Sequence, residues 1–305
     1  MTPRPARTAV LVLVFRAGAF VAGFRGGGSG PAAAADAIEI HSVHGASFLP
    51  ALQGQKPLFV LVLGSDARGD RYALNSRGDS IHIIGIDRAH DRATILGFPR
   101  DSWVPIPGHG TGKITTALTF GGPQLMAQTL ENLTGIRIDF WVLTTFHGLT
   151  KMVNAIGGLT VNVPQNLDDK YSGAHIKAGL HHLRGGQVLA FARDRHDFDT
   201  GDLARSANQG MIMLAALHQL QRAVLKDPTA LLIWITAAWR NVHTDLPIDV
   251  VLDLALAAAQ VPEGNVNNLV VPATTGSVGG ASVVFISSSA QSVYADMRAN
   301  GVVGR

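Results

Sequence analysis

Aspartate and arginine side chains are concentrated in two windows of the sequence, residues 64–101 and 193–209. In the first window each charged group lies close before or after an apolar run of strand length. Ligands of open α/β sheets bind where strands end. The sequence therefore predicts a charged ligand site at one edge of a sheet. The residues concerned are Asp66, Arg77, Asp79, Arg100 and Asp101.

Two carboxylates of this window have the chemistry of a magnesium site. Asp66 follows Gly64, which permits a sharp turn at the end of an apolar run, and Asp79 precedes the next run. Mg²⁺ takes one or two such hard oxygen ligands together with waters and substrate phosphates. Asp101, which follows Arg100, is a further carboxylate of this window.

The second window gathers guanidinium groups. Arg193 and Arg195 are two residues apart, so in an extended segment their side chains point the same way. Several guanidiniums in one place repel one another unless an anion is present, and a pyrophosphate would supply that charge through bidentate bonds. The alternative is that the arginines and aspartates of this window only pair with one another on a solvated surface, where ion pairs contribute little.

A polar helix face is expected in the same window. Asp202, Arg205 and Gln209 are spaced i, i+3 and i+7, which places them on one side of a helix. We expect the opposite side, with Met211 and Leu214, to pack against the core.

Interleaved strand and helix patterns predict an α/β fold in which helices flank a central mixed sheet as α-β-α layers. Uninterrupted apolar strands imply that the sheet is covered on both faces. The expected strands are residues 58–63, 80–86, 94–98, 138–142, 159–163 and 269–271, and the expected helices are residues 123–133, 203–225, 229–239, 248–259 and 288–300.

The helix expected at 229–239 contains a very hydrophobic stretch, residues 231–235. Because it is far too short to span a bilayer, the favoured interpretation is a buried core helix. The alternative is a lipid-facing wall of a cavity.

Residues 1–35 are expected to form a signal or membrane-anchor segment followed by a linker rich in Gly and Ala. Arg16 interrupts the apolar run, at a cost of about 2.5 to 3.5 kcal/mol for membrane insertion. Residues 36–305 would then form one extracytoplasmic domain, with a motif core at about 58–215. Whether residues 8–24 anchor the chain or are cleaved stays open. The alternative that residues 1–35 are only a Gly/Ala-rich N-terminus of a cytosolic protein also stays open.

Composition and motif spacing exclude several other kinds of site. A chain without cysteine has no thiol nucleophile, Cys-ligated metal or disulfide. The glycines before Lys113 are too closely spaced for a Walker A loop, and Ile114 stands where that loop needs Ser or Thr. Asp197, Asp199 and Asp202 lack the remaining ligands of an EF-hand. The net charge of +3 is mild and no recognition motif accompanies it, so no nucleic-acid partner is expected.

The motifs, taken in order, resemble a LytR-CpsA-Psr domain. The matching segments are residues 64–68, 77–80, 98–101, 113–114, 121–122, 138–140, 157–161, 183–190, 193–195 and 202–210. The chain departs from the family pattern where Asn208 replaces an Arg and Gly210 a Gln, and Ser80 stands for the usual Thr.

The resemblance implies a phosphotransferase on the outer face of a bacterial cell membrane. It would move a glycopolymer such as teichoic acid, capsule or arabinogalactan from a polyprenyl pyrophosphate carrier onto peptidoglycan, with the lipid chain in an apolar tunnel between sheet and helices. Asp66 and Asp79 would bind Mg²⁺ as the cofactor. The implied pyrophosphate-binding residues are Arg77, Arg100, Lys113, Arg193, Arg195, Arg205 and Gln209, and the implied catalytic set is Arg77, Asp101, Arg195, Asp202 and Arg205, with Asp202 orienting Arg205.

Two other functions stay open. A hydrolase with the same site would release the carrier phosphate without an acceptor, since the sequence does not separate water from a sugar hydroxyl as the nucleophile. A non-enzymatic regulator that binds DNA or anionic lipid is the second alternative, favoured by the basic isoelectric point of about 9.4.

Overall fold

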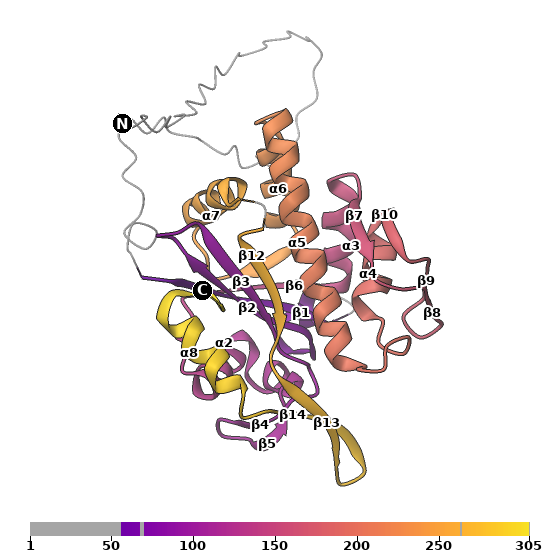
Figure 1. Cartoon of the computed structure of the whole chain (residues 1–305), viewed down its shortest axis with the longest axis vertical. Helices are drawn as coiled ribbons and strands as arrows, with labels where there is room; N and C mark the ends of the chain where they lie inside the picture. The colour runs from indigo at the N-terminus through magenta and orange to yellow at the C-terminus, as the bar shows by residue number, and fades with distance from the viewer. Residues whose placement is uncertain (1–55, 68–69, 263, 305) are drawn as a thin grey trace, which may run out of the picture. The chain divides into compact units, whose positions relative to one another are not determined.

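A computed structural model describes residues 56–67, 70–262 and 264–304, so the expected N-terminal anchor and linker lie outside the described residues. The described residues form a six-stranded sheet with the order β11-β6-β1-β2-β3-β12 (Figure 1). β1 pairs antiparallel with β2 and parallel with β6, so the sheet is mixed. The strands are β1 (Leu58–Ser65), β2 (Gly78–Asp87), β3 (Arg92–Gly97), β6 (Phe140–Thr145), β11 (Val242–Thr244) and β12 (Val266–Val270).

Helices cover both faces of this sheet, which confirms the predicted α-β-α layers (Figure 1). On one face Met126 of α2 and Tyr294 of α8 share a buried core with Leu61 and Ile83 of the sheet. The other face carries α5, whose Ser206 backbone is bonded to β2. The helices are α2 (Thr115–Thr134), α3 (Phe146–Ala155), α4 (Gly185–Arg193), α5 (Asp202–Lys226), α6 (Ala230–Trp239), α7 (Ile248–Gln260) and α8 (Ala290–Asn300).

A smaller core lies beside the main one. It joins β7 (Leu159–Val163) and β10 (Gly179–Leu183) to α4 and to Ile212 of α5. The remaining short elements are η1 (Asp70–Asn75), a 3₁₀ helix, and the hairpins β4 (Trp103–Ile106) with β5 (Gly110–Lys113), β8 (Leu167–Asp169) with β9 (Ala174–Ile176), and β13 (Ala273–Val278) with β14 (Ala281–Ile286).

Each expected strand and helix is present, with differences at some boundaries. The helix predicted at 123–133 already begins at Thr115. Gly121 and Gly122 leave helical geometry inside it, with φ of 66° at Gly122, and the chain re-enters the helix at Pro123. Proline suits the first turn of a helix, which is why the sequence pattern pointed to a start there. The short helices α3 and α4 were not among the expected elements.

The expectation of a buried core helix at 229–239 is wrong. Of the residues in α6, only Leu231 and Ala237 are buried. Ile233 is 55% exposed and Trp239 42%, so apolar side chains face outward as well as inward. No helix within the described residues has the length and apolar character needed to cross a bilayer.

Candidate functional site

The ends of β1 and β2 meet at one edge of the sheet and carry the two expected magnesium ligands. The ladder runs Gly64 to Ser80 and then Ser65 to Gly78, so Asp79 is the extra residue of a β-bulge. Gly64 does not make the turn predicted for it. It lies within β1 and admits the neighbouring strand, because a Cβ there would be 2.8 Å from the Ser80 Cβ.

Asp66 follows β1 and is held by the two residues that precede β2. Its Oδ1 accepts hydrogen bonds from the Ser76 hydroxyl at 2.5 Å and the Arg77 backbone N–H at 3.0 Å. The Arg77 side chain is exposed. Only the backbone of Arg77 is bonded to Asp66.

The segment after β3 contributes a second set of charges. The Arg100 guanidinium donates to Asp79 Oδ1. Asp101 Oδ1 lies 3.2 Å from Lys113 Nζ and 3.9 Å from Arg100 Nε. Arg100 is therefore paired with Asp79 of β2, and Lys113 of β5 is paired with Asp101.

The start of α5 brings the second window to the same edge. Asp202 is bonded through Oδ1 to the Arg205 guanidinium and through Oδ2 to the Asp101 backbone N–H, at 3.2 Å for the latter. Gln209 donates to the backbone carbonyls of Asp79 and Ala192, both at 3.1 Å. All three helix residues are buried.

The prediction about the two sides of this helix is confirmed for Met211, which packs against the smaller core, but it did not include the burial of the polar side. The side with Asp202, Arg205 and Gln209 is buried, whereas Met211 and Leu214 are only partly buried. Hydrogen bonds and ion pairs to the sheet edge compensate the burial of the polar side, which a hydrophobicity pattern does not detect.

Hydrogen bonds from Asp101 to Asp202 and from Gln209 to Asp79 show that the two windows meet at one sheet edge, and they give Arg205 charged neighbours from both. The pKa of Arg205 is lowered to about 10, mainly by burial and also by the positive charges of Arg100 and Arg195, which outweigh the opposite effect of Asp79 and Asp101. Arg205 nevertheless stays protonated at neutral pH. The solvated ion-pair alternative fails for Asp202 and Arg205, because both are buried.

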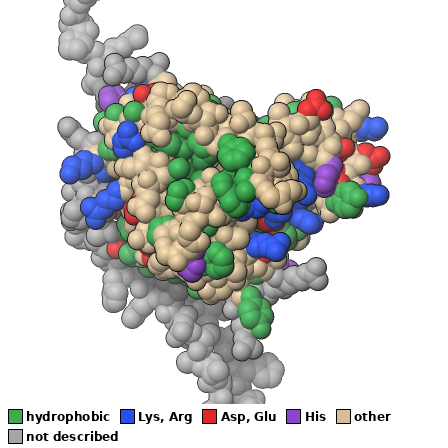
Figure 2. Space-filling view, turned by 90° about the horizontal axis from the view of Figure 1, so that it is seen from below, with side chains coloured by type: hydrophobic (Ala, Val, Ile, Leu, Met, Phe, Trp, Pro, Cys, Tyr) green, Lys and Arg blue, Asp and Glu red, His purple; other side chains and the backbone are tan. Residues whose placement is uncertain are grey.

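The remaining arginines of the second window lie beside this group. Arg193 ends α4, with its guanidinium carbon 5.1 Å from the centre of the Phe146 ring. The expected extended segment thus begins only at Asp194. Arg195 is partly exposed and makes no ion pair within the described residues. Viewed from below, Lys and Arg side chains gather where the β7–β10 part of the chain meets the main body (Figure 2).

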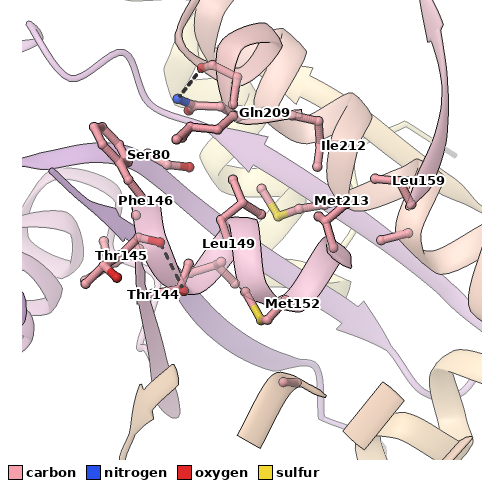
Figure 3. A pocket seen from close by; sticks show the side chains of 18 of the residues that line it. Ser80, Thr144, Thr145, Phe146, Leu149, Met152, Leu159, Gln209, Ile212 and Met213 are labelled. Atoms are coloured by element: carbon pink, nitrogen blue, oxygen red, sulfur yellow. Dashed lines mark hydrogen bonds between the residues drawn. The ribbon is translucent and has the colours of Figure 1, made fainter. Parts of the chain in front are cut away.

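An apolar cavity of about 310 Å³ opens beside the charged group. Asp79, Ser80, Arg193 and Gln209 contribute its polar lining. Figure 3 shows Ser80, Phe146 and Gln209 close together, with Leu149, Met152 and Leu159 further along the pocket. Other lining residues are Val62, Leu63, Thr144, Ile212, Met213, Ala216, Trp234, Ala237 and Ala238. Sequence reasoning missed Phe146 and the α3 wall, although the apolar residues of α3 at helical spacing carried that signal.

The carboxylates suit a cation that also binds phosphate. Asp66 and Asp79 each use Oδ1 in the bonds above, and each Oδ2 has no hydrogen bond within the described residues. No cluster of three or more His, Asp or Glu side chains in the described ranges has the arrangement of a metal site. Mg²⁺ needs fewer protein ligands than that, because waters and substrate phosphates complete its shell.

Comparison with known proteins decides the family. A model of the LytR_cpsA_psr family matches residues 32–298. The chain belongs to the LytR-CpsA-Psr family. Regulatory protein MsrR of Staphylococcus aureus (strain COL) is 30% identical over 241 residues, which cover 77% of this chain and 69% of MsrR.

Two further LytR-CpsA-Psr relatives are informative. Polyisoprenyl-teichoic acid--peptidoglycan teichoic acid transferase TagU of Bacillus mycoides (strain KBAB4) is 30% identical over 200 residues, covering 65% of this chain and 64% of TagU. The crystal structure of B. subtilis TagV has the same fold, with a TM-score of 0.70 and 24% identity over 83% of this chain and all of TagV (100%).

The departures from the LytR-CpsA-Psr pattern are explained in part by packing. Asn208 is buried, at 1% exposure, and its amide nitrogen has no hydrogen-bond partner within the described residues. At Gly210 a Cβ would lie 1.9 Å from Asn268 Oδ1 on β12. A Gln at position 210 requires the Asn268 side chain to move, so the position of Asn268 depends on the glycine at 210. Nothing in the structure explains Asn208.

Asp194, between the two arginines, is a buried acid that sequence reasoning did not single out. It is fully buried, and its Oδ2 has no hydrogen-bond partner within the described residues. Burial raises its pKa to about 6, and the negative charges of Asp197 and Asp169 act in the same direction. The ionised form therefore disfavours the folded state above pH 6, where Asp194 is charged in both states.

We predict that Asp194→Asn increases the free energy of unfolding at pH 8 by about 2 kcal/mol, because it removes this buried charge. The gain should shrink as pH falls from 6 to 4, where native Asp194 becomes protonated. Urea denaturation at pH 8 and pH 4.5 measures both values. Asp199→Asn, which removes an exposed carboxylate from the same loop, is the control. A loss of stability at pH 8, or an equal gain at both pH values, contradicts the prediction.

Proposed function

We propose that the protein is a phosphotransferase that moves a glycopolymer from a polyprenyl pyrophosphate carrier onto peptidoglycan. One observation carries the proposal: an edge of the sheet lined by Arg and Asp opens directly into an apolar cavity of about 310 Å³. A lipid-linked pyrophosphate has the same two parts, an anionic group attached to a hydrocarbon chain. The name of the TagU relative gives a polyisoprenyl-linked teichoic acid as its donor and peptidoglycan as its acceptor.

The balance of charge at the sheet edge supports pyrophosphate binding. Asp202 and Asp79 each hold one arginine, whereas Arg195 has no partner carboxylate within the described residues. A dianionic or trianionic group would relieve the repulsion that these guanidiniums impose on one another. The proposed pyrophosphate-binding residues are Arg100, Lys113, Arg193, Arg195 and Arg205, with the exposed Arg77 at the rim. Gln209, which the sequence placed in this set, donates both of its amide protons to backbone carbonyls and so supports the site without a free donor for phosphate.

Magnesium is the proposed cofactor, held by the unused oxygens of Asp66 and Asp79. When bound, it would neutralise charge on the transferred phosphate. The protein itself contributes position: Arg205 is fixed by Asp202, and Asp101 is fixed by its backbone bond to Asp202. Asp101 is the proposed acceptor of the proton from the incoming sugar hydroxyl, because it is the carboxylate beside Arg100 and Lys113.

The proposed place of action is the outer surface of the cell membrane. Residues of α6 line the cavity with Trp234, Ala237 and Ala238, while Ile233 and Trp239 of the same helix are exposed. A carrier whose hydrocarbon enters the cavity must leave the bilayer nearby. A helix that is apolar on both sides suits that passage, because its outer side can lie in the headgroup region.

Loss of Arg195 or Arg205 is predicted to reduce turnover of a polyprenyl pyrophosphate at least 100-fold, which is the scale for removing one preorganised charge-stabilising donor. The measurement is release of polyprenyl phosphate by Arg195→Ala and Arg205→Ala proteins that keep native circular dichroism. Arg222→Ala, which removes an exposed arginine further along α5, should leave turnover unchanged. Native turnover in both site variants refutes the assignment.

The exposed side of α6 is predicted to matter only when the donor is in a bilayer. Ile233→Ser should lower turnover several-fold with donor in vesicles and leave turnover of detergent-dispersed donor unchanged, because detergent delivers the lipid without a membrane surface. Leu180→Ser is a matched control, since Leu180 is 72% exposed on β10. Equal effects of Ile233→Ser in vesicles and detergent would reject the membrane contact.

Two alternatives give different products. A hydrolase releases carrier phosphate from a lipid-linked donor but forms no product joined to peptidoglycan fragments, so incubation with both substrates separates the two reactions. A DNA-binding regulator should bind DNA with an affinity that falls steeply with salt. The name of MsrR is the observation in favour of a regulator. Recovery of the chain in the membrane fraction, accessible to external protease, would remove the DNA-binding alternative.

A further inference from the structure

Ser80 and its neighbour Asp79 both lie at the charged end of the cavity. Successive residues of a regular strand point to opposite faces. The bulge at Asp79 breaks this alternation, so both residues line the cavity. The missing side chain of Gly64 leaves room for Ser80, since a Cβ at Gly64 would be 2.8 Å from the Ser80 Cβ.

Ser80 is bonded to a fully buried histidine. The Ser80 hydroxyl is 3.2 Å from His82 Nδ1, and His82 Nε2 is 3.1 Å from the backbone carbonyl of Ser206 on α5. Gly97 on β3 allows this approach, because a Cβ there would lie 2.4 Å from the Ser206 hydroxyl and 2.9 Å from His82 Nε2. The three residues form a chain of bonds from the helix to the cavity.

The direction of every bond in this chain follows from the Ser206 carbonyl. A carbonyl oxygen only accepts, so His82 Nε2 must carry a proton. The ring is fully buried, which favours the uncharged imidazole, and an uncharged ring with its proton on Nε2 has none on Nδ1. Nδ1 therefore accepts, and the Ser80 hydroxyl donates its only proton to it.

We propose that Ser80 presents an oxygen lone pair to the cavity and serves as a neutral third oxygen of the cation site at Asp79. The partner must be electropositive, which fits a divalent cation or one of its bound waters and does not fit a phosphate oxygen. Ser80 is a positioning residue for that cation, and His82 and Ser206 fix its orientation. The inference deepens the proposed function, because it assigns a ligand to the magnesium of that same site.

The test is Mn²⁺ binding to the full chain, followed by electron paramagnetic resonance of the unbound ion, because Mn²⁺ takes the same oxygen ligands as Mg²⁺. Ser80→Ala should raise the Kd for Mn²⁺ about fivefold, the scale of one lost hydrogen bond. Ser80→Thr, which keeps a hydroxyl, should stay within twofold of the unaltered protein. Ser206→Ala is the matched control, because it removes a buried hydroxyl without a hydrogen-bond partner in the described residues and keeps the carbonyl.

A second measurement does not depend on any variant folding. Nitrogen-15 NMR of the histidine rings should give His82 as the neutral form with the proton on Nε2 between pH 6 and pH 8. A proton on Nδ1, or an unchanged Mn²⁺ Kd in folded Ser80→Ala protein, overturns the proposal. Weaker Mn²⁺ binding by Ser80→Ala without any pyrophosphate turnover by the unaltered protein would keep this inference and reject the proposed function. Turnover that persists in EDTA, with no Mn²⁺ binding, would overturn this inference and the magnesium assignment, and would keep only the transfer reaction of the proposed function.

Discussion

Asp202 joins the two halves of the site, because its two carboxylate oxygens bind partners from distant parts of the chain. Oδ1 binds the Arg205 guanidinium and Oδ2 binds the backbone N–H of Asp101, which follows β3. Both Asp202 and Arg205 are buried, and a buried ion pair of this kind is costly to break from one side, since the remaining charge is left unpaired. The start of α5 is thereby fixed to the sheet edge that carries Asp79 and Arg100.

The other features of the site follow from this attachment. With α5 held against the sheet, Gln209 reaches the carbonyls of Asp79 and Ala192, and the Ser206 carbonyl reaches His82. The next turns of α5 line the apolar cavity with Ile212 and Met213. One helix therefore provides the charged end and part of the apolar wall. A ligand that binds both the charged end and the apolar wall must itself have a charged group at one end and an apolar remainder.

Part of this arrangement could be predicted from the sequence. Apolar runs located the strands, and strand ends predicted where Asp79 and Arg100 would gather, because the position of a strand end is a local property. The burial of Asp202 and Arg205 could not be predicted, since their compensating partners come from other segments. The same reason applies to Asp194 and to α6, whose hydrophobic sequence indicated a core that the packing does not provide. Gly64 was interpreted as a turn because the close approach of Ser80 is a contact between strands.

The central claim is that the guanidiniums at the sheet edge and the cavity bind two parts of one ligand. A crystal structure of the full chain with geranylgeranyl pyrophosphate and Mg²⁺ tests it most directly. The account predicts a diphosphate in contact with Arg195 and Arg205, and a hydrocarbon chain that passes Phe146 to reach Leu149 and Met152. A diphosphate bound away from both arginines, or a hydrocarbon chain outside the cavity, would contradict it.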